Sequence, residues 1–90
     1  MPTIFLPAVL QGHTNNSTQV EVAAETLEEL LETLIKKFPN LKKYFFNQDN
    51  ELCNFLNIYL NGEDVRFLQG LKTPIRKQDK ITVLLAVAGG

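Results

Sequence analysis

The sequence predicts an α+β domain in which one main helix packs on one face of a mixed β-sheet. Three observations favour this class. Residues 26–38 form one strongly amphipathic helical segment, strand-like runs precede and follow it, and an Asn-Gly turn joins two of the later runs. Because one helix covers only one face of a sheet, this order is typical of a two-layer α+β arrangement.

The N-terminal residues predict a hairpin. Residues 3–10, TIFLPAVL, are apolar and β-branched enough for a strand, with Pro7 at its edge, at a bulge or at its end because proline cannot donate to a ladder. A turn-rich loop, QGHTNNS, follows at 11–17. Residues 18–24 then alternate between polar and apolar, as a half-exposed second strand does.

The helix is the clearest element. Apolar residues recur with helical spacing from residue 27 to residue 38. Thr26 precedes this stripe and Glu29 lies three residues later, which is the spacing of a capping box. Pro39 is expected to end the helix.

The second half predicts further strands. Residues 40–52 favour a short helical turn that packs on the core, and residues 55–61 alternate as a strand does. Asn61-Gly62 is a strong hairpin signal, because both residues tolerate positive φ. We expect a short return strand over 65–68 and a last strand over 80–87.

A β-grasp sheet fits this order best, with the last strand inserted centrally beside the first. That strand is apolar on both faces, although the helix covers only one. The β-propensity of Val and Leu explains part of this pattern. An exposed apolar patch more often marks an interaction site, and pleat alternation makes Leu84, Tyr59 and Phe5 the candidate partner-binding surface.

Composition excludes several classes of partner. Nine Lys and Arg against ten Asp and Glu give a formal net charge of −1, too little to attract nucleic acid or an acidic membrane. Cys53 is the only cysteine, so no internal disulfide can form. The first residues lack a signal-peptide pattern, and no apolar run approaches the roughly 20 residues of a membrane span. These features predict a cytoplasmic protein.

Internal catalysis has little support. His13 is the only histidine and lies in a polar loop, where we expect it to be solvated. Cys53 has no neighbour in the sequence that would act as a base, which favours a structural thiol. No phosphate-binding loop, nucleophile elbow or metal-ligand cluster is present. We therefore expect no catalytic residue, no metal ligand and no resident cofactor.

The C-terminal sequence LLAVAGG carries the strongest functional signal. Glycine has no Cβ, so Gly89 and Gly90 would let the backbone slip through a narrow channel. We expect one folded domain over residues 1–88 and a flexible tail over 89–90. Together with Ala88, this tail would enter a second protein's active site and carry the Gly90 carboxylate there.

The chain ends in LLAVAGG, and the segment DKITV directly precedes this ending. Together with NIYLNGEDVRF earlier in the chain, these segments resemble ubiquitin-like sulfur-carrier proteins of the ThiS/MoaD family. Over residues 54–90 the likeness is closest to the CysO-type carriers of cysteine biosynthesis. It implies a ubiquitin-like β-grasp fold and a carrier that is not an enzyme by itself.

The resemblance also implies a reaction cycle. An E1-like adenylating enzyme would use ATP to activate the Gly90 carboxylate, and sulfur would displace AMP to leave a thiocarboxylate. A pyridoxal-phosphate-dependent cysteine synthase would accept the sulfur, and a zinc-dependent peptidase would release the product. ATP, zinc and pyridoxal phosphate would belong to these partners, while Gly89 supplies clearance.

Three alternatives stay open at this point. The same ending serves carriers for thiamine and molybdopterin synthesis. A ubiquitin-like modifier would instead be conjugated to lysines through Gly90. A β-grasp binding module would not need its tail at all.

Overall fold

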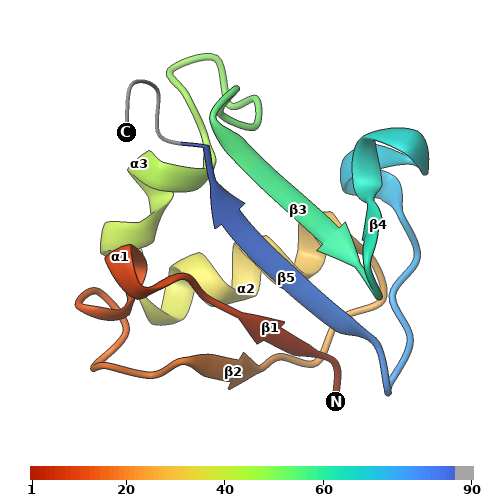
Figure 1. Ribbon diagram of the computed structural model, residues 1–90, viewed down its shortest axis with the longest axis horizontal. Helices are drawn as coiled ribbons and strands as arrows, with labels where there is room; N and C mark the ends of the chain where they lie inside the picture. The colour runs from red at the N-terminus through yellow and green to blue at the C-terminus, as the bar shows by residue number, and fades with distance from the viewer. Residues whose placement is uncertain (87–90) are drawn as a thin grey trace.

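The computed structural model describes residues 1–86 as a five-stranded mixed sheet with α2 across one face (Figure 1). The strands are ordered β2-β1-β5-β3-β4, as predicted for a β-grasp sheet. The helices, 3₁₀ turns and strands, in chain order, are β1 (Thr3–Phe5), α1 (Ala8–Gln11), β2 (Gln19–Glu21), α2 (Leu27–Lys37), η1 (Pro39–Leu41), α3 (Lys42–Phe45), β3 (Leu56–Leu60), β4 (Glu63–Asp64), η2 (Val65–Phe67), η3 (Gly70–Lys72) and β5 (Lys80–Leu85).

Strand β5 lies at the centre of this sheet. It runs parallel to β1, with Ile81 opposite Ile4, and antiparallel to β3, with Ile81 opposite Leu60. The prediction of a central last strand is confirmed. The last described residue, Ala86, therefore follows directly on the best-supported strand of the molecule.

Helix α2 begins at the predicted cap. The Thr26 hydroxyl accepts the N–H of Glu29 at 3.2 Å, and the Glu29 carboxylate accepts the N–H of Glu25 at 3.1 Å. The first bond satisfies a backbone donor that the first turn leaves free, and the second ties the residue before the cap to the helix. The helix ends at Lys37, two residues before Pro39.

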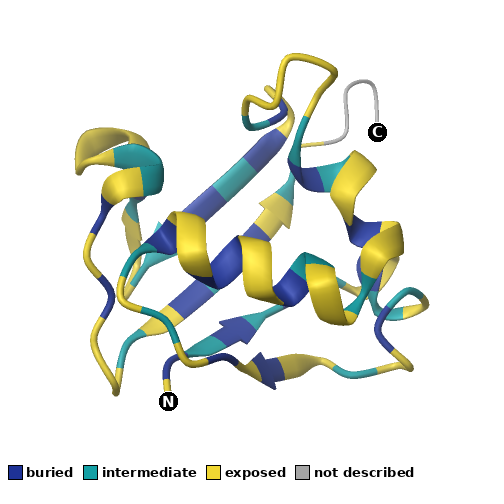
Figure 2. Ribbon diagram, turned by 180° about the vertical axis from the view of Figure 1, so that it is seen from behind, coloured by how far each residue is buried: buried dark blue, intermediate teal, exposed yellow. Residues whose placement is uncertain are grey.

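The core lies between α2 and the inner face of the sheet (Figure 2). The leucines of the helical stripe are fully buried, and they face the inward side chains of β1, β3 and β5. Each such side chain stabilises the fold by roughly 1.5–3 kcal/mol relative to an exposed one. Phe45 of α3 is also fully buried, which confirms that the segment before β3 packs on the core.

Two strand predictions are wrong. The predicted strand over 3–10 ends at Phe5, and Ala8–Gln11 form the short helix α1. Pro7 explains the change, because it lacks an N–H for the ladder and precedes α1 with extended backbone angles. The predicted return strand at 65–68 is the 3₁₀ turn η2, which starts where the Asp64 carboxylate accepts the N–H of Arg66.

The hairpin turn is confirmed, and β4 follows it immediately. Asn61 and Gly62 both have positive φ, +51° and +88°, as a type I′ turn requires. The last strand ends at Leu85 rather than at 87, and position 87 lies outside the described residues. Within residues 1–86, none of the helices combines the length and apolar composition that crossing a bilayer requires.

Candidate functional site

The outer face of the sheet, opposite α2, carries the predicted partner-binding residues. Phe5 is paired with Thr82 and Thr82 with Tyr59, so these side chains form one row across β1, β5 and β3. Leu84 follows two residues later on β5, opposite Asn57. Alternation along the strands puts all five side chains on this face. We call these five residues the outer patch.

Exposure in the outer patch is uneven. Leu84 is 47% exposed, whereas Phe5 and Tyr59 are half-buried. The structure thus brings Leu84, Tyr59 and Phe5 to one face, with Leu84 the most accessible of the three. Their role in binding a partner stays a prediction.

Phe55 was not among the predicted patch residues. Its carbonyl accepts the N–H of Ala86 at 2.7 Å, which continues the β3–β5 pairing beyond both strands. The Phe55 side chain is 43% exposed. An exposed aromatic therefore lies beside the last described residue, and the alternating sequence FLNIYL was the available signal for it.

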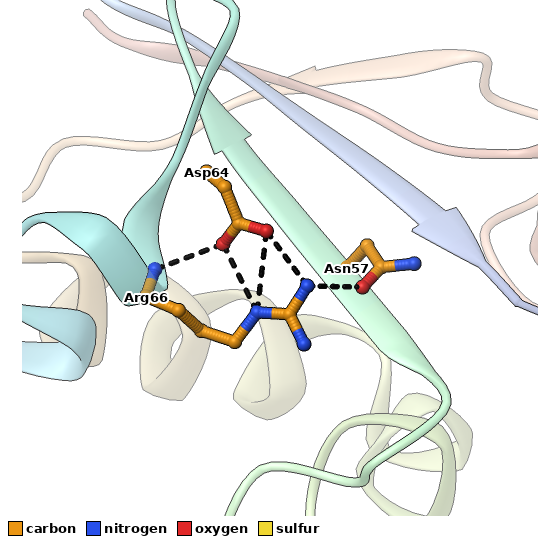
Figure 3. Close-up of polar contacts among 3 residues, drawn as sticks. All are labelled: Asn57, Asp64 and Arg66. Atoms are coloured by element: carbon orange, nitrogen blue, oxygen red, sulfur yellow. Dashed lines mark hydrogen bonds and ion pairs between the residues drawn. The ribbon is translucent and has the colours of Figure 1, made fainter.

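A polar cluster at the edge of the outer patch was also missed (Figure 3). Arg66 Nη2 donates to Asp64 Oδ2 at 2.7 Å and to Asn57 Oδ1 at 2.9 Å, and Arg66 Nε donates to both Asp64 oxygens at 3.2 Å. The Arg66 side chain holds the pKa of Asp64 below its usual value, with a further contribution from the Arg66 backbone N–H. Asp64 in turn raises the pKa of Arg66, so both groups are ionised at neutral pH.

Two side chains with reactive groups are held away from the outer patch. The Cys53 thiol is buried and donates to the Lys43 carbonyl at 3.8 Å, in keeping with a structural thiol. His13 is not simply solvated as predicted, because its ring lies against Tyr44 with 5.2 Å between centroids. Among residues 1–86, no three His, Cys, Asp or Glu side chains gather closely enough to hold a metal ion.

The predicted tail residues Ala88, Gly89 and Gly90 lie outside the described part of the chain, as does the predicted boundary at 88. What the structure gives is their starting point. Ala86 is exposed and follows β5 directly. At about 3.3–3.6 Å per residue, the Gly90 carboxyl lies at most roughly 15 Å from Ala86.

Comparison with known proteins identifies the family. The ThiS family model matches residues 4–90. Sulfur carrier protein CysO from Mycobacterium tuberculosis is 36% identical over 90 residues, which are 98% of this chain and 97% of the relative.

Solved structures agree with this assignment. A chain in the crystal structure of the Amycolatopsis orientalis BexX/CysO complex matches with a TM-score of 0.91 and 33% identity, over 100% of both chains. The small archaeal modifier protein 1 from Methanosarcina acetivorans matches with a TM-score of 0.87 and 30% identity, over 99% of this chain and 95% of that one. This protein therefore belongs to the ThiS family and is a ubiquitin-like β-grasp sulfur carrier of the CysO, ThiS and MoaD type rather than an enzyme.

Proposed function

We propose that this protein carries sulfur as a thiocarboxylate on Gly90 and delivers it for cysteine biosynthesis. An E1-like adenylating enzyme forms the bond between the Gly90 carboxylate and the α-phosphorus of ATP, with pyrophosphate as leaving group. A hydrosulfide equivalent then attacks the carbonyl carbon and AMP leaves. The carrier provides the carboxyl group and the folded domain that the partner binds, and the partner enzyme catalyses the reaction.

The single observation that carries this proposal is the 36% identity to a CysO sulfur carrier along 98% of the chain. Glycine at positions 89 and 90 fits the chemistry, because a backbone without side chains can enter a narrow active site. A sulfur atom held on a docked protein also reacts at a far higher effective concentration than free sulfide.

Delivery involves a second set of partners. We propose that a pyridoxal-phosphate-dependent cysteine synthase accepts the sulfur and that a zinc-dependent peptidase releases the finished amino acid. The cycle would run in the cytoplasm, where ATP is available to the adenylating enzyme. Thiamine or molybdopterin synthesis is the alternative destination for the same thiocarboxylate.

A second candidate function is conjugation to other proteins through Gly90. It is favoured by the 30% identity and 0.87 TM-score to a small archaeal modifier protein. Both functions share the adenylation step and differ in what attacks the activated carbonyl. A lysine amine gives an isopeptide adduct, whereas sulfide gives a thiocarboxylate.

Intact-mass analysis tests the proposal. The carrier is incubated with the adenylating enzyme, Mg-ATP and sulfide, and we expect a mass gain equal to the exchange of one oxygen for sulfur. The Gly90→Ala variant should keep the melting temperature of the parent chain but lose most of this gain, because the added Cβ crowds the partner's channel. An unchanged wild-type mass, or isopeptide adducts without thiocarboxylate, would contradict it.

A further inference from the structure

The ion pair between Arg66 and Asp64 is exposed on one side only. The Arg66 side chain is 63% exposed, whereas that of Asp64 is 10% exposed. The Asp64 side chain is therefore mostly covered, whereas most of the Arg66 side chain is open to solvent. A partner approaching this surface meets the cation of the pair rather than its anion.

The Arg66 guanidinium is held in place by hydrogen bonds, and its Nη1 donors are not used by them. Nε and Nη2 donate to Asp64 and Asn57 (Figure 3). Among residues 1–86, no residue accepts a hydrogen bond from Nη1. An arginine has five N–H donors, so the two on Nη1 remain for a partner's carboxylate. Because Asp64 and Asn57 already fix the side chain, a partner's carboxylate would bind it with little further loss of side-chain entropy.

This guanidinium borders the outer patch. Asn57, which accepts from Arg66, is the direct cross-strand neighbour of Leu84. Asp64 is likewise the cross-strand neighbour of Tyr59. The surface thus combines an apolar centre with a fixed cation at its rim, which is the usual anatomy of a protein interface.

We propose that Arg66 is a specificity-determining residue that binds a carboxylate of the adenylating enzyme when that enzyme covers the outer patch. This inference rests on the proposed function. The adenylating enzyme is the favoured occupant because its active site must reach Gly90, no more than roughly 15 Å of chain beyond Ala86. A second copy of this chain offers no such reason to cover this end of β5.

Steady-state ATP–pyrophosphate exchange tests the inference, with the adenylating enzyme fixed and the carrier concentration varied. Arg66→Glu should raise the KM for the carrier about tenfold or more and leave kcat within about twofold, because the charge acts on docking. Arg66→Lys keeps the charge but loses the Nη1 donors that Asp64 and Asn57 hold in place, so its KM should lie between those of Arg66→Glu and the parent chain.

Arg76→Glu is the matched control. It makes the same change of charge at another exposed arginine, which precedes the start of β5 and so lies far along the strand from Leu84. Its KM should stay within about twofold of the parent value. A charge-reversed Asp or Glu→Arg variant of the adenylating enzyme at the contacting position should restore a low KM to Arg66→Glu.

The possible outcomes separate the two proposals. If the wild-type carrier supports no exchange, the proposed function fails. If it supports exchange and Arg66→Glu matches Arg76→Glu, only the docking role of Arg66 is overturned. A lower KM for Arg66→Glu, or a wild-type dimer in sedimentation that Arg66→Glu breaks apart, would overturn it in favour of a contact within or between copies of this chain.

Discussion

The two faces of β5 are built from similar apolar residues, yet their surroundings differ. Ile81 and Val83 point inward and are almost fully buried under α2, whereas Leu84 points outward and is nearly half exposed. Covering an aliphatic side chain stabilises the fold, but leaving one open costs little and provides a surface for a partner. The neighbouring elements, rather than residue type, decide which role each residue has.

The largest effect should come from cutting into the inner face. Ile81→Ala removes a fully buried side chain from the central strand, and we expect the free energy of unfolding to fall by about 3 kcal/mol. Urea denaturation measures this change. Leu84→Ala is the comparison within the same strand and should cost less than about 1 kcal/mol. Equal losses would show that both faces belong to the core.

The next largest effect should come from a substitution on the outer face, and it should change partner binding rather than stability. Leu84→Asp places a charge at the most exposed apolar side chain of the outer patch, so we expect the affinity for the adenylating enzyme to fall about tenfold or more. The urea midpoint should change little, since the side chain is already 47% exposed. Calorimetric titration with the enzyme, beside a denaturation curve, separates binding from folding. A large loss of stability with unchanged affinity would contradict this assignment.

A smaller effect on stability should follow from removing the N-terminal cap of α2, the helix that covers the inner face. Thr26→Ala removes the hydroxyl that accepts the Glu29 N–H, and we expect a loss of about 1 kcal/mol in stability. Affinity for the adenylating enzyme should not change, because α2 lies on the opposite face from the outer patch. Thr26→Ser is the conservative control and should recover most of the lost stability.

The smallest effect concerns the ion pair at the rim. Arg66 lowers the native-state pKa of Asp64, so its stabilising contribution is complete above the ordinary Asp pKa of about 3.9 and is lost as the pH falls through the lower native value. Asp64→Asn should therefore destabilise the protein slightly at pH 7, and the difference should vanish in strong acid. Urea midpoints at both pH values check this, and a pH-independent difference would contradict the role of the charge.

The sequence predicted correctly those elements for which two independent local patterns point to the same structure, or for which one turn residue pair is decisive. The apolar period and the Thr26 cap both define α2, and Asn61-Gly62 defines its turn because positive φ is needed there. The predicted first strand is too long because TIFL and AVL are both apolar runs, and Pro7 between them lacks the N–H donor that a continuing ladder needs. Competition between the Asp64 cap and strand pairing explains the missed turn at 65–67.

The site was predictable only in part, for a physical reason. Alternation along a strand places Leu84, Tyr59 and Phe5 on one face, since that pattern is local. The cluster of Arg66, Asp64 and Asn57 depends on the register between β3 and β4 and on the direction of η2, neither of which a single segment specifies. The tail prediction concerns residues that the structure does not describe, so its test is chemical.

The parallel pairing of β1 with β5 has a consequence for biosynthesis. Thr3 is opposite Lys80, so β1 can pair with its central neighbour β5 only after nearly the whole chain has been synthesised. Without β5, the sheet order leaves β2-β1 and β4-β3 as two unconnected hairpins, and such pairs are marginal in water. A chain that ends before residue 80 therefore lacks the strand that joins the two hairpins, and we expect it not to form the sheet.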